Sequence, residues 1–132
     1  MLKHSIISVL FFSLTAINIA SAQEPKEMSS LDYALSDASL SGQTLKLTSC
    51  RISHVSVQSA LCNINVGEAG VGNIVLETGT MDKTELKQAI LKCAGLKGFE
   101  SEECDASIIG IAKKKTTKPN FQVKKIIWNV DK

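Results

Sequence analysis

The clearest pattern in the chain is an alternation of apolar and polar residues, which predicts β-strands. Leu45 and Leu47 occupy one parity of the first such segment. The apolar positions then move by one residue, to Cys50 and Ile52. Because successive side chains point to opposite faces of a strand, both pairs can face the core only if the strand accommodates an extra residue. We therefore expect a β-bulge near Thr48–Ser49.

The second β-patterned segment shows the same change of parity. Its early apolar positions are Val55 and Val57, and its later ones are Cys62, Ile64 and Val66. Two bent neighbouring strands are typical of a coiled sheet that closes into a barrel. A turn near residues 55–57 would bring these two strands together as a hairpin.

A run of glycines follows the second strand. Gly67, Gly70 and Gly72 predict a flexible turn before a third strand over residues 73–78, which Gly79 ends. The alternative is a phosphate-binding loop, but such a loop leads into a helix and carries a lysine. This segment leads into a strand and lacks that lysine, so we favour the turn.

Helical spacing of apolar residues occurs first ahead of the strands. The apolar positions after Ser30 fall at i, i+3, i+4 and i+7, and they are Leu31, Ala34, Leu35 and Ala38. This spacing predicts a short helix with Ser30 as its N-cap. A helix this short is stable only when it packs on something else.

A clearer helix follows the third strand. Asp82 is suited to cap it, and Glu85 three residues later completes a capping-box pattern. An apolar stripe runs from Leu86 to Cys93, and Gly95 ends the helix as a C-terminal cap. We interpret the stripe as part of the core.

Two further strands complete the pattern. Residues 106–112 predict a fourth strand, in which Gly110 marks a bend or a close backbone approach. A polar loop over residues 113–120 leads to a fifth strand over residues 121–130. The predicted order is therefore three strands, a helix and two strands.

The N-terminal segment has the features of a signal peptide. Lys3 precedes an uncharged apolar stretch that ends in the cleavage motif Ala20-Ser21-Ala22. Serines dilute the stretch below the level expected of a membrane-spanning helix. We expect a signal peptide over residues 1–22, a mobile polar leader and short helix over 23–41, and one domain over 42–132. The mature protein would be exported, either periplasmic or secreted, with no transmembrane anchor.

Four cysteines remain after the predicted cleavage, at positions 50, 62, 93 and 104. An exported chain of this size with an even cysteine count usually forms disulfides, so we expect two. Three pairings are possible, and the predicted hairpin and helix favour Cys50–Cys62 and Cys93–Cys104. A four-thiolate zinc site or a thiol oxidoreductase would need C-x-x-C motifs, which are absent.

Composition narrows the possible functions. The chain has 132 residues and 44% hydrophobic content, which suits one domain with a core and is too short for a multidomain enzyme. Its 15 Lys and Arg nearly balance 13 Asp and Glu, so net charge does not point to a nucleic acid or a membrane surface. With only two histidines we expect no histidine-rich metal site and no cofactor.

The order of elements resembles that of the OB-fold, a five-stranded Greek-key barrel with a helix at one end. Residues 42–47 at the start of the barrel and 123–128 at its end are similar to those of small OB-fold proteins exported by bacteria. The expected fold is a five-stranded OB-like barrel of the all-β or α+β class, with a short N-terminal helix and two disulfides. An open α+β sheet is the alternative.

The resemblance implies a ligand site on the face of the second and third strands, flanked by the loops that join strands one to two and four to five. The second of these loops is rich in lysine. The candidate ligand-binding residues are Lys113, Lys114, Lys115, Lys118 and Lys124, with Lys125 beside them. They predict binding of a polyanion, such as an acidic glycan or lipid head groups. The alternative is a solvent-exposed hairpin end whose lysines prevent edge pairing.

Nucleic acid is the polyanion that we favour least. Proteins of this fold that bind single strands stack bases on exposed aromatic side chains. The mature domain offers few, namely Tyr33, Phe99, Phe121 and Trp128. We expect Phe121 and Trp128 to lie in the core.

Catalytic chemistry has little support in the sequence. His54 is the only histidine after the cleavage site, and no nucleophile elbow accompanies it. We therefore expect a non-enzymatic binding module that holds a protein or an anionic envelope component. The alternative is a subunit of a homo-oligomeric assembly, because the size, export signal, disulfides and helix before the barrel resemble those of pentameric B subunits of bacterial AB toxins.

Overall fold

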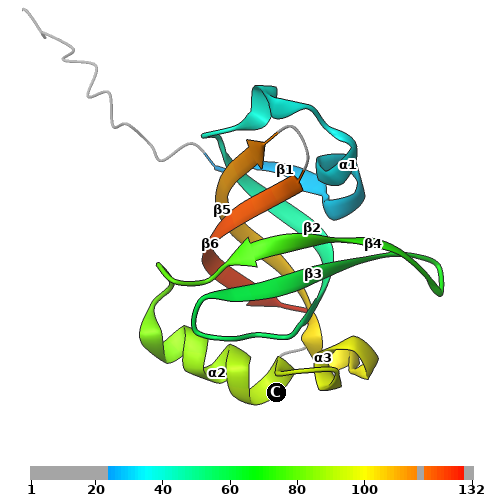
Figure 1. Cartoon of the computed structure of the whole chain (residues 1–132), viewed down its shortest axis with the longest axis vertical. Helices are drawn as coiled ribbons and strands as arrows, with labels where there is room; N and C mark the ends of the chain where they lie inside the picture. Colours follow the sequence, from blue (N-terminus) through cyan, green and yellow to red (C-terminus); the bar gives the residue numbers. More distant parts are fainter. Residues whose placement is uncertain (1–23, 116–117, 130–132) are drawn as a thin grey trace, which may run out of the picture.

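Five strands close into a β-barrel in the computed structural model, which describes residues 24–115 and 118–129 (Figure 1). The barrel strands are β2 (Thr44–Ser53), β3 (Ser59–Val66), β4 (Ala69–Glu77), β5 (Asp105–Lys115) and β6 (Lys118–Trp128), and a further strand, β1 (Lys26–Ser29), pairs with β2. The helices are α1 (Ser30–Leu35), α2 (Lys83–Cys93) and α3 (Lys97–Glu100), with 3-10 turns at Ala38–Leu40 and Glu102–Cys104. The predicted signal peptide lies outside the described residues.

The barrel closes because β2 and β5 pair with each other at the two ends of the strand order. Neighbouring strands follow the order β2, β3, β4, β6 and β5, and β5 pairs back onto β2. The pairs are antiparallel except for β4 with β6, which run parallel. The alternative of an open sheet is therefore wrong.

The segment predicted as a mobile leader contains a strand instead. Residues 26–29 form β1, which pairs in parallel with residues 45–48 of β2. Strand β3 pairs with β2 farther along, from Arg51 to Ser53. Strand β1 thus covers one edge of the first half of β2 and provides hydrogen-bond partners for the backbone N–H and C=O groups there.

Helix α1 follows directly and differs in detail from the prediction. Its N-cap is Ser29, whose side chain accepts a hydrogen bond from the Asp32 backbone N–H. Ser30 is instead buried, and its hydroxyl donates to the Ser49 carbonyl at 2.9 Å. Leu35, expected on the packed face, is exposed. The packing of α1 on the barrel is decided by Tyr33.

The predicted bulge in β2 is confirmed. The pairing of β2 with β5 shifts register between Leu47 and Cys50, and Ser49 has a φ of 62°. The bulge bends β2, so its first half pairs with β1 and its second half with β3. Just after the bulge, the Cys50–Cys62 disulfide joins β2 to β3, with Cα atoms 5.0 Å apart.

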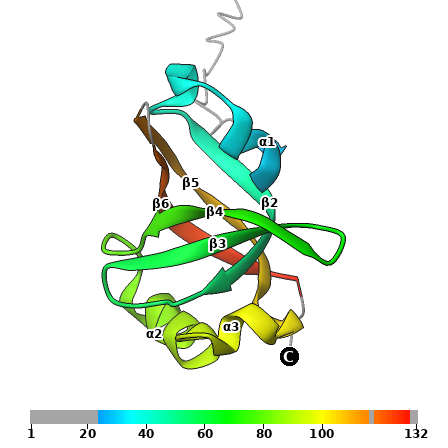
Figure 2. The same cartoon turned by 45° about the vertical axis from the view of Figure 1, so that its right-hand side comes forward.

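The predicted glycine turn is present but short, at residues 67–68, and the third strand begins earlier than predicted. Strand β4 begins at Ala69, so Gly70 and Gly72 lie within it, and a register shift at Asn65 of β3 accommodates them. The resulting β3–β4 ribbon projects beyond the barrel in both views (Figures 1 and 2). Val66 and Val71 are exposed on this ribbon.

Helices α2 and α3 lie at the end of the barrel opposite α1 (Figure 1). Asp82 caps α2 as predicted, accepting from the Glu85 backbone N–H at 3.1 Å. The Glu85 side chain does not return to the cap, because its Oε1 accepts from the Ile126 backbone N–H of β6 at 2.8 Å. The predicted Cys93–Cys104 disulfide ties the end of α2 to the 3-10 turn directly before β5.

Close packing of β5 against β6 explains Gly110. The two strands shift register between Ile109 and Gly110. A Cβ at Gly110 would collide with the Gln122 carbonyl oxygen and the Phe121 ring. The predicted close backbone approach is therefore confirmed.

Gly110→Ala should lower the free energy of unfolding by about 2 kcal/mol, because overpacking against backbone atoms forces the strands apart. Gly79→Ala is the matched control, since no atom lies within 4 Å of an added Cβ there. It should change stability by less than about 0.5 kcal/mol. Equal denaturant midpoints for the two variants would contradict the packing.

Tyr33 anchors α1 inside the barrel. Its ring is fully buried and meets the Phe121 ring edge to face, with centroids 5.6 Å apart. Its hydroxyl donates to the Asn120 carbonyl at 2.6 Å. Burial raises the pKa of Tyr33 to about 12, and a backbone hydrogen bond from Lys113 lowers it less.

The chain has one tyrosine, so tyrosinate absorbance reports Tyr33 alone. We expect Tyr33 to ionise with a pKa of about 12 in the folded protein, against 10.0 for a tyrosine in an unfolded chain. The stabilising contribution is then complete below pH 10 and is lost as the pH rises towards 12, because the unfolded state gives up its proton first. Between pH 10 and about pH 12, the free energy of unfolding should fall less for Tyr33→Phe than for the wild-type protein. Ionisation near pH 10 in the folded protein would contradict the burial.

Candidate binding site on the barrel face

A polar hollow lies where the OB-like prediction placed a ligand. The strands concerned are β3 and β4, flanked by the loop at residues 54–58 and by the β5–β6 hairpin. The hollow has a volume of about 350 Å³. Its lining residues come from this loop, from β4 and the segment after it, and from β5 and β6, and they are Gln58, Glu77, Gly79, Thr80, Lys113 and Gln122.

A loose ion pair crosses the hollow. The Lys113 Nζ lies 3.4 Å from the Glu77 Oε2, and both side chains are nearly half exposed. Within the described residues, this carboxylate oxygen is buried and accepts no hydrogen bond. Exposed pairs of this kind contribute little to stability. Gln122 Nε2 donates to Thr80 Oγ1 at 3.0 Å, which fixes the opposite wall.

The structure gathers part of the predicted lysine set and separates the rest. Lys115 pairs with Lys118, and Lys114 with Pro119, so the backbones of these lysines lie at the hairpin end beyond Lys113. The side chains of Lys114, Lys115 and Lys118 lie outside the described part of the chain.

Lys124 and Lys125 are exposed on β6 but do not line the hollow. Lys125 pairs with Ile109, four residues before Lys113 on β5. That offset is about 13 Å along a strand. The expectation of one cluster that includes Lys124 is therefore not met, because the antiparallel pairing carries β6 away from the hairpin end.

The aromatic residues are mostly occupied in packing. Phe121 and Tyr33 are fully buried, as expected for Phe121. Trp128 is partly buried, and the Lys92 Nζ lies 4.4 Å from its ring centroid. Phe99 is exposed, but it belongs to α3 at the far end of the barrel.

His54 belongs to a hydrogen-bonded group that supports the β2–β3 hairpin. Its Nδ1 lies 2.9 Å from the Ser53 Oγ, and Ser53 is fully buried. Asn63 Nδ2 donates to this same oxygen at 2.7 Å and to the Arg51 carbonyl at 2.8 Å. The buried Ser53 hydroxyl is therefore engaged in hydrogen bonds that support the fold. In the described residues, no group of three or more His, Cys, Asp or Glu could hold a metal ion.

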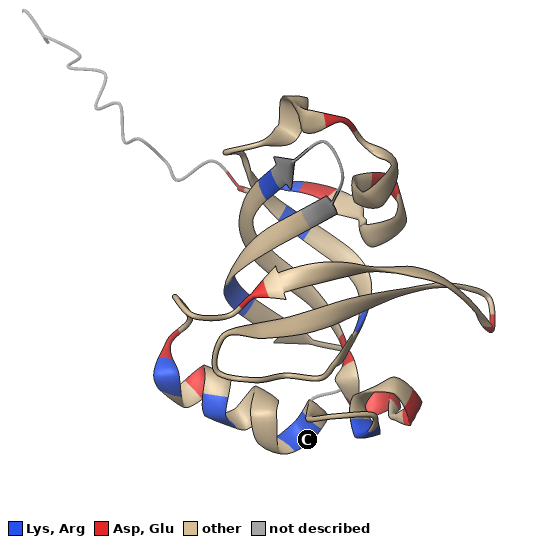
Figure 3. Ribbon diagram, in the orientation of Figure 1, with Lys and Arg blue, Asp and Glu red and all other residues tan. Residues whose placement is uncertain are grey.

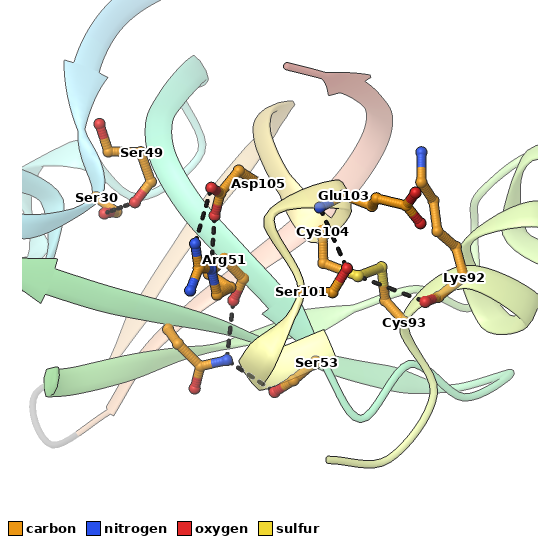
Figure 4. Close-up of polar contacts among 11 residues, drawn as sticks. Ser30, Ser49, Arg51, Ser53, Lys92, Cys93, Ser101, Glu103, Cys104 and Asp105 are labelled. Carbon is orange, nitrogen blue, oxygen red and sulfur yellow. Dashed lines mark hydrogen bonds and ion pairs between the residues drawn. A yellow bond between two sulfur atoms is a disulfide. The ribbon is translucent and has the colours of Figure 1, made fainter. Parts of the chain in front are cut away.

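Sequence reasoning missed a second charged pair, between Arg51 and Asp105 (Figure 4). Arg51 donates to both carboxylate oxygens, from Nε at 2.8 Å and from Nη2 at 3.0 Å. The hydrogen bond to Asp105 raises the pKa of Arg51, which keeps the guanidinium charged. The two residues face each other in the register of β2 and β5, so the pair belongs to barrel closure.

Comparison with models of known protein families gives no match, and a search of curated proteins also gives none. Among the described residues, no helix has the length and apolar character needed to cross a membrane.

Proposed function

We propose that this protein is a small exported binding module that holds a protein or an anionic envelope component at the polar hollow. The observation that carries the proposal is the position of Lys113, which lines a hollow flanked by two loops and makes only an exposed ion pair with Glu77. An anion on the ligand would replace Glu77 as the partner of Lys113. The neighbouring lysines of the hairpin would strengthen the local positive potential.

We further propose that the barrel is an OB-fold. Support comes from the strand order, from the parallel pairing of β4 with β6, and from α2 between β4 and β5. The polar hollow also lies at the face and loops through which OB-folds bind ligands. Export is supported by the two disulfides, which form and persist in oxidising compartments.

Replacing Lys113, Lys114 and Lys115 with Ser should weaken retention on a heparin column, with elution at clearly lower salt. Thermal stability should change little, because exposed charges contribute little to folding. The control replaces Lys46, Lys92 and Lys97 with Ser, which removes the same charge from residues of β2, α2 and α3 that do not line the hollow. If the hairpin and control variants elute at the same salt concentration, a site at the hairpin is refuted.

The second candidate function, a subunit of a homo-oligomeric assembly, is favoured by the β3–β4 ribbon. Val66 and Val71 are 53% and 51% exposed on it. The ribbon extends past the barrel, where exposed strand edges can pair with another chain. A second copy could cover these valines.

The mass of the protein in solution, measured without reductant, separates the two functions. A binding module should be a monomer with two disulfides. A ring like those of the toxin subunits should have about five times the mature mass. If a ring forms, Val71→Lys should disrupt it, whereas Leu91→Lys, at an exposed apolar position of α2, should not.

A further inference from the structure

A second concave surface, distinct from the polar hollow, lies along α2. It is a groove of about 450 Å³ lined by Val57, Gly79, Met81, Lys83, Leu86, Lys87, Ile90 and Leu91. The helical residues fall at i, i+3, i+4, i+7 and i+8, so one face of α2 forms one wall. The loop at residues 54–58 and the segment after β4 supply the rest.

The groove combines a buried floor with exposed apolar walls. Met81 and Leu86 are nearly buried and belong to the core. Val57 is 67% exposed and Leu91 70% exposed, although both are apolar. A ligand that covers them removes apolar surface from water, which favours binding.

The charges of the groove are all at one end. Lys83 and Lys87 lie one turn apart in the first half of α2, and Leu91 lies one turn beyond them. Figure 3 shows basic residues along the ribbon of this helix. The rise from Lys83 to Leu91 is about 12 Å. The carboxylates nearest in sequence are engaged elsewhere, because Asp82 caps α2 and Glu85 accepts from Ile126. The groove therefore has a cationic end and an apolar end.

We propose that this groove binds a single-chain anionic amphiphile, such as a fatty acid. Its head group lies between Lys83 and Lys87, and its chain covers Leu86, Ile90 and Leu91. The volume falls in the range of small-molecule sites. A stable protein interface needs more surface than one face of an 11-residue helix supplies. This site is independent of the ligand proposed for the polar hollow.

The test is calorimetric titration of the disulfide-intact protein with dodecanoate below its micelle concentration. Dodecanoate should bind with one-to-one stoichiometry, and dodecyltrimethylammonium, with the same chain and opposite charge, should bind at least tenfold more weakly. Decanoate should bind roughly tenfold more weakly than dodecanoate, because each buried methylene contributes to affinity. No heat with dodecanoate, or equal binding of the cationic amphiphile, overturns the proposal.

Two variants locate the ligand. Replacing Lys83 and Lys87 with Gln should weaken dodecanoate binding about tenfold, whereas replacing Lys124 and Lys125 with Gln should not. Leu91→Ser should weaken it too, and Leu35→Ser is the matched control, because Leu35 is equally exposed on α1. Unchanged dodecanoate binding in the α2 variants overturns the assignment. It is also overturned if an acidic amphipathic peptide binds to the protein and dodecanoate does not bind.

The Lys113, Lys114 and Lys115 triple variant should bind dodecanoate like wild type. Loss of dodecanoate binding in this variant would place the amphiphile in the polar hollow and overturn the groove. Loss of heparin retention with intact dodecanoate binding supports both sites, so each can fail without the other.

Discussion

Strand β2 has to pair on both of its edges, and on one edge with two different strands. It meets β5 along most of its length, β1 along its first half and β3 near its end. A straight strand cannot satisfy these partners in one closed sheet. The bulge at Ser49 bends β2 between its two halves, and the Cys50–Cys62 disulfide and the Arg51–Asp105 pair hold the strands that meet just beyond it.

A second set of links holds the end of the barrel that α2 and α3 cover. Glu85 joins α2 to the backbone of β6, and the Cys93–Cys104 disulfide joins the end of α2 to the turn directly before β5. Gly98 of α3 packs against the Ile52 and Ser53 backbone, where a side chain would collide. These links hold α2 in a fixed position while part of one face stays uncovered.

The segment between β4 and α2 connects the two concave surfaces. Gly79 lines both the polar hollow and the groove along α2, so the surfaces lie on either side of this short connection. Their chemistry differs: the hollow is lined mainly by polar side chains, and the groove mainly by apolar ones with lysines at one end. The two proposed ligands therefore differ in chemistry, although their sites share Gly79.

Local features of the sequence determined much of the fold. The change of parity in β2 predicted its bulge, Asp82 predicted the start of α2, and Gly110 predicted a close approach. The cysteine pairs followed because each lies within one hairpin or beside one helix end. Such features depend on neighbouring residues, whose geometry the period of the strand or helix sets.

Only the tertiary structure decided which residues line the polar hollow, because their meeting depends on the register between strands that are distant in sequence. Glu77, Gln122 and Gln58 come together with Lys113 only when β4 and β6 pair in parallel. The same pairing geometry separates Lys124 from the hairpin lysines that neighbour it in sequence. The side chain of Glu85 fits a capping box by local pattern, but the barrel offers it the backbone N–H of Ile126. The sequence pattern identified the lysines and the capping residues, and closure of the barrel determined which side chains come into contact.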